Sequence, residues 1–508
     1  STLVTSDKAL VDPLNGQPFP GARIPQSRMP ATLLPFLKTG IGKGAWLPTP
    51  NSRVPGYNYF KDDTRAYVRD QFITRIDQNF GEKTFLYARY AYNVGDLTNP
   101  HLNENYQFFQ RNHTHSLAVH ASRSFRPNLI GELTFAFSQF IQTEPADTIG
   151  TYDITNKILK IRGLATNPSS WGAPGWSVTS FSQLGEGGAL PRRWTPTNFE
   201  FRPMVSWTYG RHSLRVGADA MRFISTFQEI IGPNGDFGFD GRFSNYALGD
   251  FLLGYPATSF FAPDPFDPQP RYLGLGGYAQ DDWKVTPHLT LNLGVRYEWV
   301  GVPQSSNHTY SNIYLPSTGS PRIVLADGAQ GITFEGVKHE LLTILPYANA
   351  KSLGLPNGLL TSDKKNFGPR VGLAYSVPRS GNLVVRGGYG IFYQRDTENK
   401  FTDMALNPPF VGIHNYNFDQ SNFRQFDWYN PTSFSTVDGV GLFANDMNIR
   451  NGRVQAWNLS LDRTVGGTLL SAAYVGNVSR HLSNMEMPNA ARPGPGPITS
   501  RRRWQDWG

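Results

Sequence analysis

The stretch YAQDDWKVTPHLTLNLGVRYEWV, residues 278–300, decides the fold of this chain. Its second half alternates strictly between apolar and polar side chains. The apolar positions are Leu289, Leu291, Leu293, Val295, Tyr297 and Trp299. The polar positions between them are Thr290, Asn292, Gly294, Arg296 and Glu298. A period of two over this length predicts a β-strand with one apolar and one polar face, and a tight turn at 286–288 joins it to a preceding strand.

Five further hairpins show the same alternation. They pair residues 71–79 with 84–93, 113–125 with 129–141, 198–209 with 211–224, 370–377 with 383–394, and 454–464 with 468–478. Their turns carry Gly, Asn or Pro, which are the residue types that tight turns favour. Short helices are expected only at 31–37 and at 246–254, where the second would be a packed turn that anchors its loop.

The connections between the hairpins are long, whereas the turns inside them are short. The long connections cover residues 142–197, 225–270, 301–365 and 395–453, and their sequences show no decipherable pattern. Structureless loops of this length are uncommon in compact soluble domains. Short turns on one side and long loops on the other are typical of an outer-membrane barrel, where they are periplasmic and extracellular respectively.

The predicted fold is therefore all-β, an incomplete antiparallel up-and-down transmembrane β-barrel. Three segments are expected: a Pro/Gly-rich loop segment at 1–65, a barrel portion of about twelve strands at 66–484, and a loop-like tail at 485–508 that precedes missing strands. The apolar face of each strand would meet lipid, and aromatic side chains near strand ends would form two girdles.

The composition agrees with many strands and tight turns. The 508 residues include 51 glycines and 13% aromatic residues but only 17% charged residues. The longest apolar runs are too short for a membrane-spanning helix. The chain has no cysteine, which excludes disulfides and thiolate metal sites. The net charge of +8 comes from scattered side chains, apart from residues 501–503, and we assign it to solvated loops and a lumen instead of a nucleic-acid site.

The hairpin at residues 278–300 also resembles a known family. It is similar to the signature hairpin of TonB-dependent outer-membrane transporters, specifically the Oar-like β-barrel family. The residues that carry this resemblance are Tyr278, Gln280, Asp281, Asp282, Trp283, Gly294, Arg296 and Tyr297. Segments 366–375, 386–393 and 455–461 resemble the following hairpins of the same family in the same order, and the similarity extends from about residue 70 to residue 482.

The resemblance implies a function and a set of partners. Members take up large or scarce ligands, carbohydrates or peptides among them, through a barrel closed by an N-terminal plug that the TonB complex moves. The expected partners are therefore the TonB complex, acting through a missing N-terminal region, the lipid bilayer of the bacterial outer membrane, and an unknown ligand. Neither an enzymatic activity nor a cofactor is expected. Because a plug, an N-terminal domain, a leader and the last strands are not recognisable, we expect the sequence to be part of a longer protein.

Candidate sites in the barrel portion are few. Arg296, Glu298 and Arg386 fall on polar faces and are predicted to line the lumen. His113 and His115 share a strand face and could bind a metal, but a third ligand is not evident, so lumenal or loop hydrogen bonding is favoured. A calcium loop at Asp236 and Asp240 lacks the spacing of an EF-hand, and a turn-rich loop is the favoured interpretation.

The adjacent carboxylates of Asp281 and Asp282 raise two questions. Neighbouring strand residues point to opposite faces, so the pair cannot act together as an acid/base dyad. If Trp283 faces lipid, strict alternation places Asp281 on the same face. Either a β-bulge lies near Asp281, or this part of the strand stands clear of the hydrocarbon.

Two alternatives to a transporter are left open. One is a passive porin of about twelve strands, because an even number of strands can close on itself. The other is a soluble or surface-attached β-rich module that binds glycans, whose apolar faces would pack together between two layers.

Overall fold

The computed structural model of the chain describes most of its residues. The described ranges are 8–103, 105, 108–144, 150–164, 168–186, 188–262, 267–316, 319–329, 346–380, 382–394, 399–411, 414–433, 442–497 and 499–504. Within these ranges, no helix combines the length and the apolar character that crossing a membrane requires.

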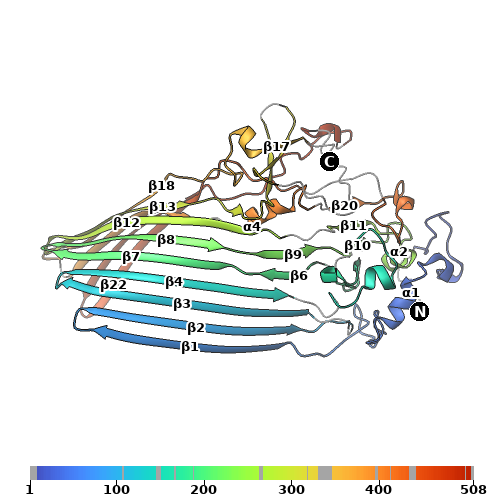
Figure 1. Ribbon diagram of the computed structural model, residues 1–508, viewed down its shortest axis with the longest axis horizontal. Coiled ribbons are helices and arrows are strands. Elements are labelled where there is room, and N and C mark those ends of the chain that lie inside the picture. The colour runs from blue at the N-terminus through green and yellow to red at the C-terminus, as the bar shows by residue number, and fades with distance from the viewer. Residues whose placement is uncertain are drawn as a thin grey trace.

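The main element is a wall of twelve strands that follow one another in antiparallel order (Figure 1). They are β1 (Ala66–Phe80), β2 (Thr84–Asn99), β3 (Phe108–Arg126), β4 (Leu129–Glu144), β7 (Thr197–Tyr209), β8 (His212–Ile224), β12 (Pro270–Thr286), β13 (Leu289–Val300), β18 (Asn366–Ser376), β19 (Leu383–Gln394), β21 (Gly452–Val465) and β22 (Thr468–Arg480). These are the six predicted hairpins, so this prediction is confirmed. The sheet is not closed, because β1 pairs with β2 and β22 pairs with β21, but β1 and β22 do not pair with each other.

Three short strands extend this sheet beyond the third and fourth hairpins. They are β6 (Ala189–Trp194), β9 (Phe227–Ile231) and β14 (Gln304–Ser305). β6 continues the register of β7 along β4, because Gln139 pairs with Thr197 and Gln142 pairs with Trp194. The same faces therefore run without interruption from the wall into this extension.

The two faces of the wall differ in composition along every hairpin. On β13, Leu291, Leu293 and Val295 share one face, and the last two are 38% and 47% exposed. The opposite face carries Asn292, Gly294 and Arg296, and two hollows lie against it. We call the hollowed, polar face the inner face and the apolar one the outer face. Since large outer-face side chains are exposed and no second layer of described residues covers this face (Figure 1), the sandwich alternative is wrong.

The long connections form a second region at one end of the wall, opposite the hairpin turns (Figure 1). This loop layer contains a four-stranded sheet of β5 (Gly175–Val178), β10 (Asp236–Phe239), β11 (Thr258–Phe261) and β20 (His414–Asn417), and a three-stranded sheet of β15 (Ser311–Tyr314), β16 (Arg322–Leu325) and β17 (Tyr347–Asn349). Its α-helices are α1 (Leu33–Thr39), α2 (Ala247–Leu253) and α4 (Asn399–Thr402). Single helical turns lie at η1 (Pro20–Ala22), η2 (Gln26–Arg28), η3 (Ile154–Ile158), η4 (Pro168–Ser170), η5 (Ala350–Leu353), η6 (Asp403–Leu406), η7 (Phe423–Gln425) and, in the tail, η8 (Thr499–Arg501).

The expectation that these connections are loops without structure is wrong. Trp46, Trp176, Phe251 and Phe423 come from four separate segments of the chain and are almost completely buried in one aromatic core. A second core, around Tyr310 and neighbouring apolar residues, joins the connection after β13 to the one after β19. Helix α2 supplies Phe251 to the first core, so the predicted anchoring turn is confirmed.

Candidate functional site

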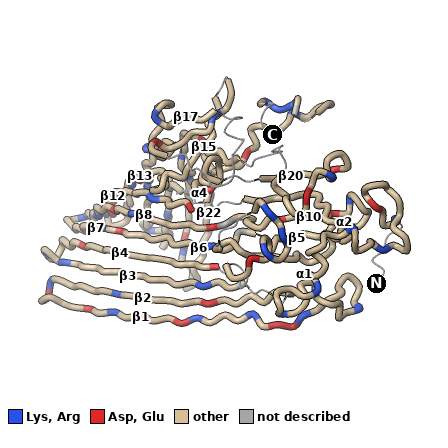
Figure 2. The backbone as a smooth tube through the Cα atoms, turned by 45° about the vertical axis from the view of Figure 1, so that its right-hand side comes forward, with Lys and Arg blue, Asp and Glu red and all other residues tan. Residues whose placement is uncertain are grey.

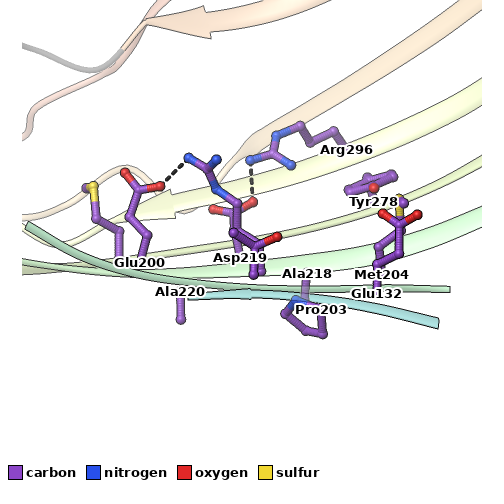
Figure 3. Close-up of a pocket in the computed structure, with 12 residues that line it drawn as sticks. Glu132, Glu200, Pro203, Met204, Ala218, Asp219, Ala220, Tyr278 and Arg296 are labelled. Atoms are coloured by element: carbon purple, nitrogen blue, oxygen red, sulfur yellow. Dashed lines mark hydrogen bonds and ion pairs between the residues drawn. The ribbon is translucent and has the colours of Figure 1, made fainter. Parts of the chain in front are cut away.

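The candidate site is the inner face of the wall around Tyr278 and Arg296. A hollow of about 400 Å³ lies here between strands β4, β7, β8, β12 and β13 (Figure 3). A second hollow of about 730 Å³ adjoins it, since both are lined by Met204, Tyr278 and Arg296. Figure 2 shows acidic and basic positions along the strands of the wall as well as in the loop layer.

Two glycines make room for the large side chains of this site. A Cβ on Gly217 would lie 2.6 Å from the ring of Tyr278, which is its direct cross-strand partner. A Cβ on Gly276 would lie 2.5 Å from an Asp219 carboxylate oxygen and 2.8 Å from the Arg296 guanidinium. Because these glycines carry no side chain, the tyrosine ring and the guanidinium can lie flat across neighbouring strands.

Arg296 is the centre of an ion-pair network. Its guanidinium donates to Asp219 on β8 at 2.5 Å (Figure 3). It also donates to Glu298 on its own strand. Arg202 pairs with Glu200 on the neighbouring strand β7. The network holds one guanidinium between two carboxylates, so the side chains are held in place and one negative charge is left in excess.

The ion pairs continue on both sides of this network. Asp282 accepts hydrogen bonds from Arg215 at 3.1 Å, from Asn292 at 2.5 Å and from Gln280 at 3.3 Å. Arg386 pairs with Asp462 across strands β19 and β21. The structure thus places Arg296, Glu298 and Arg386 on one face, each bonded to a partner. That this face borders an aqueous lumen stays a prediction.

The remaining signature residues divide between the two faces. Asp281 lies on the outer face, where its carboxylate contacts His212 at 2.6 Å, and the His212 ring stacks on Trp283. Asp282 points inward, so the two carboxylates diverge as predicted. Tyr297 lies outward, its ring centroid 4.7 Å from that of Phe367. Gly294 lines the second hollow.

The register answers the question about Asp281. The only irregularity between β12 and β13 lies between Lys284 and Thr286, on the turn side of Trp283. Asp281 therefore shares the outer face with Trp283 without a bulge between them. It lies near the hairpin turns, where the partner His212 begins β8.

The histidine prediction needs a correction. His113 and His115 receive contacts from the hydroxyls of Tyr92 and Tyr90, each at 2.8 Å, so they do engage in hydrogen bonding. However, the register places them on the face of Phe137, which is the outer face. The two histidines therefore lie on strand β3 and not in a loop, on the face opposite the hollows.

Asp236 and Asp240, the two aspartates considered for a calcium loop, make contacts within the loop layer. Asp240 pairs with Arg242 at 2.5 Å. Burial raises the pKa of Asp236, whose carboxylate accepts a long bond from the Gly188 amide at 3.5 Å. Neither carboxylate contacts the other.

Sequence reasoning missed the partners that complete the network. Asp219 and Asp462 stand on strands distant in sequence from their arginines, and Asp219 is 77 residues from Arg296. Their alternation marks them as inner-face residues. Pairing them with a given arginine requires the cross-strand register, which the sequence does not specify.

Comparison with known proteins supports the barrel. Residues 1–508 match the sequence model of a family described as an outer membrane beta barrel domain. No curated protein matches the chain in sequence. Similar solved structures include the outer membrane transporter YddB from Escherichia coli, with 10% identity, a TM-score of 0.43 and coverage of 80% of this chain and 40% of that one.

Two further structures are similar to the same extent. The copper transporter OprC has 9% identity, a TM-score of 0.42 and coverage of 82% of this chain and 45% of that one. The alcaligin outer membrane receptor FauA from Bordetella pertussis has 12% identity, a TM-score of 0.38 and coverage of 84% and 46%. The chain thus spans less than half the length of these three proteins.

Proposed function

Because the chain belongs to the family of outer membrane beta barrel domains, we propose that it forms part of the wall of a TonB-dependent transporter. The chain lies in the bacterial outer membrane, and its family is one of barrels and not of enzymes. In this proposal the transporter uses energy from the inner membrane to take up a large or scarce ligand. The TonB complex would act through a region outside this sequence, as the resemblance of the signature hairpin implies.

The ion-paired inner face is the observation that carries the proposal. Arg296 is held between Asp219 and Glu298, and Asp282 accepts hydrogen bonds from three side chains. Side chains fixed in this way present a preorganised polar surface against which a plug domain can pack and from which it can be displaced. When the plug moves, hydrogen bonds between the plug and this surface are exchanged for hydrogen bonds to water. The net free-energy cost of moving the plug is therefore small.

The loop layer supports ligand selection at the opposite end of the wall. Binding residues lie disproportionately on loops that a rigid scaffold positions. Here the described parts of the connections pack against one another, because Trp176 and Phe251 lie in a shared core. A fixed surface of this kind is suited to binding one ligand selectively, whereas a passive pore requires only an open entrance.

The second hollow suggests a neutral, hydrogen-bonding ligand, a carbohydrate or a peptide. Gln280, Asn292 and Asn458 line it together with Tyr278 and Phe392. Three arginines line it as well: Arg215 and Arg296 are paired with carboxylates, and Arg370 lies over the Phe392 ring. Amides bond to hydroxyls or peptide groups, and aromatic rings pack against sugar rings or apolar side chains. We expect N458A to weaken binding of maltoheptaose or of an uncharged heptapeptide in detergent, measured by calorimetry. Unchanged binding of both probes, or binding of neither, would remove this part of the proposal.

Conductance measurements distinguish the transporter from the porin alternative. Protein purified from outer membranes and inserted into a planar bilayer is expected to show a closed pore, because a plug fills the transporter. Steady open conductance would establish the porin and overturn the transporter. In cells, a protonophore is expected to abolish accumulation of the ligand without altering the amount of protein in the outer membrane.

A further inference from the structure

One segment of the loop layer lies against the inner face of the wall. It consists of α4 and η6, residues 399–406, and we call it the cap segment. Phe401 of the cap segment lines a small hollow together with Tyr272 of β12. Tyr272 stacks on the buried Phe223 of β8, with ring centroids 4.7 Å apart. Because Tyr272 shares its strand face with Tyr278, the cap segment covers the inner face at the end that carries the loop layer.

The cap segment also belongs to the core that packs against β9. Phe227, Glu229 and Ile231 alternate along β9 and therefore share one face. Phe227 and Ile231 pack against the second core of the loop layer, to which the cap segment contributes Phe401 and Met404. Glu229 is thus a carboxylic acid between two apolar side chains on a packed surface.

Glu229 stands in a row of charged side chains that crosses β4, β6 and β9. In the register, Arg192 is the partner of Glu144 on one side and of Glu229 on the other. Arg192 forms its ion pair with the buried Glu144. Among the described residues, Glu229 has no ion-pair partner within 4.0 Å. Asp403, the first residue of η6, adds a carboxylate from the cap segment, so three carboxylates share one arginine.

The protonation of Glu229 decides how much negative charge this row carries. Burial raises the pKa of Glu229 to about 7, from an ordinary value of 4.5. The charge of Arg192 lowers this pKa, and the charges of Glu144 and Asp403 raise it. The proton on Glu229 is therefore exchanged near neutral pH.

The other charged side chains of the neighbouring elements do not face Glu229. Arg193 is paired in register with Gln228, which lies on the opposite face of β9. Asp267 contacts the side chain of Gln228 on that same face. Lys400 of the cap segment contacts the segment that follows β22. Among the described residues, the charges that act on Glu229 are thus those of its own row.

We propose that Glu229 is a proton-dependent latch that holds the cap segment on the inner face. With its proton, Glu229 is neutral and fits the apolar surface, while Arg192 stays balanced by Glu144. Without the proton, Glu229 places a further negative charge beside two carboxylates that share one arginine. Burial and like-charge repulsion then both favour release of the cap segment. The latch is a property of the fold, and only its effect on ligand passage rests on the proposed transport function.

The direction of the pH effect follows from the two states of the cap segment. The closed state keeps the proton to a higher pH than an open state in which the pKa of Glu229 is ordinary. The advantage of the closed state is complete below pH 4.5 and is lost as the pH rises from about 4.5 through 7. Between about pH 6 and pH 8, the ratio of closed to open molecules should fall about tenfold.

The reactivity of one introduced thiol in the cap segment tests the latch. Ala405 is buried in the second core, so the thiol of A405C is accessible only when the cap segment opens. A405C and A405C/E229Q are purified from outer membranes in detergent and treated with a maleimide at pH 6 and pH 8. The rates of the two variants are compared at the same pH, because the intrinsic reactivity of the thiol then cancels.

We expect the ratio of the A405C rate to the A405C/E229Q rate to rise about tenfold from pH 6 to pH 8. The control A405C/E132Q neutralises an inner-face carboxylate outside the row and should behave as A405C does. A405C/D403N should show a smaller rise, since loss of this carboxylate lowers the pKa of Glu229. A ratio that is the same at both pH values would overturn the latch, and an undiminished rise in A405C/D403N would remove Asp403 from it.

A second measurement covers the case in which A405C does not fold. Heat-modifiable migration in SDS gels reports whether the wall is intact. Hydrogen exchange of residues 399–406 is then compared between the unaltered protein and E229Q, and the same rise in the ratio of rates is expected. A constant ratio would contradict the proposal here too. A latch that opens while E229Q cells take up the ligand at an unaltered rate would overturn only the effect on passage.

Discussion

The wall and the loop layer hold their structure by different means. In the wall, strands are joined by continuous backbone ladders, and its large apolar side chains remain exposed, such as Leu459 at 49% and Val295 at 47%. In the loop layer, Trp46, Trp176 and Phe251 are fully buried in a core that four distant segments share. The wall therefore depends on the membrane for the burial of its apolar face, whereas the loop layer buries its own. Substitutions should therefore change the stability of one region without changing that of the other.

The largest effect is expected from removing an aromatic ring from the loop core. Trp176 packs against Phe36 and Phe251, with ring centroids 6.2 and 5.7 Å away. W176A should destabilise the loop layer by about 3–5 kcal/mol because it leaves a cavity. Limited proteolysis should then cut the long connections while heat-modifiable migration of the wall stays unchanged. The control W207A removes an exposed wall residue and should leave the loops resistant. Simultaneous loss of both regions in W176A would show that they are not separate.

A slightly smaller effect is expected from a charge on the outer face of the wall. Leu459 and Ala456 lie on the same strand but on opposite faces, and Ala456 lines the second hollow. L459R should cost about 2–4 kcal/mol, because the guanidinium would enter hydrocarbon, whereas A456R should cost less than about 1 kcal/mol. Urea-dependent folding into lipid vesicles measures both variants. Equal costs would contradict the assignment of the faces.

A pH-dependent effect is expected in the loop layer. Burial raises the pKa of Glu186 to about 8, from an ordinary value of 4.5. The hydrogen bond from the Ala173 amide lowers the pKa and offsets only part of this effect, and Oε1 has no partner among the described residues. The folded loop layer holds this proton to higher pH than the unfolded chain does. Its stability should therefore fall as pH rises from about 4.5 through 8.

The variant E186Q should remove this pH dependence. At pH 8 it should stabilise the loop layer by on the order of 1–3 kcal/mol, with little change at pH 4.5. Proteolytic protection of residues 168–186 across this pH range reports the effect. A loss of protection that is the same in E186Q as in the unaltered protein would show that another group titrates.

The smallest effect is expected at the inner face. Asp219 is one of two carboxylates that pair with Arg296, and Glu298 remains when Asp219 is replaced. Because these groups are partly exposed, D219N should change the stability of the wall by less than about 1 kcal/mol. The double variant D219N/E298Q should lose more than the sum of the single variants, since it leaves Arg296 without a carboxylate. A loss above about 3 kcal/mol in D219N alone would mean that the network is structural and not a preorganised surface.

The strands of the wall could be predicted from the sequence because each hairpin shows its own alternation of apolar and polar residues. Alternation from Leu289 to Trp299 needs only neighbouring residues to assign both faces. Strand β12 is longer than predicted, because its first half contains Gly274, Gly276 and Gly277, which obscure the alternation. The loop core could not be predicted, since Trp46, Trp176 and Phe423 are scattered through irregular segments and acquire a pattern only in three dimensions. The Arg296–Asp219 pair was inaccessible for the same reason.

The measurement that tests the account most directly is single-cysteine labelling along β13. The chain contains no cysteine, so each introduced thiol is the only one within these 508 residues. Cysteines placed in turn at residues 290 to 295 are treated with a membrane-impermeant maleimide in outer membranes and again after denaturation. We expect protection at Leu291, Leu293 and Val295, which face hydrocarbon, and greater labelling at Thr290, Asn292 and Gly294. Uniform labelling, or protection at the second set and labelling at the first, would contradict the claim that the apolar face of the wall meets lipid.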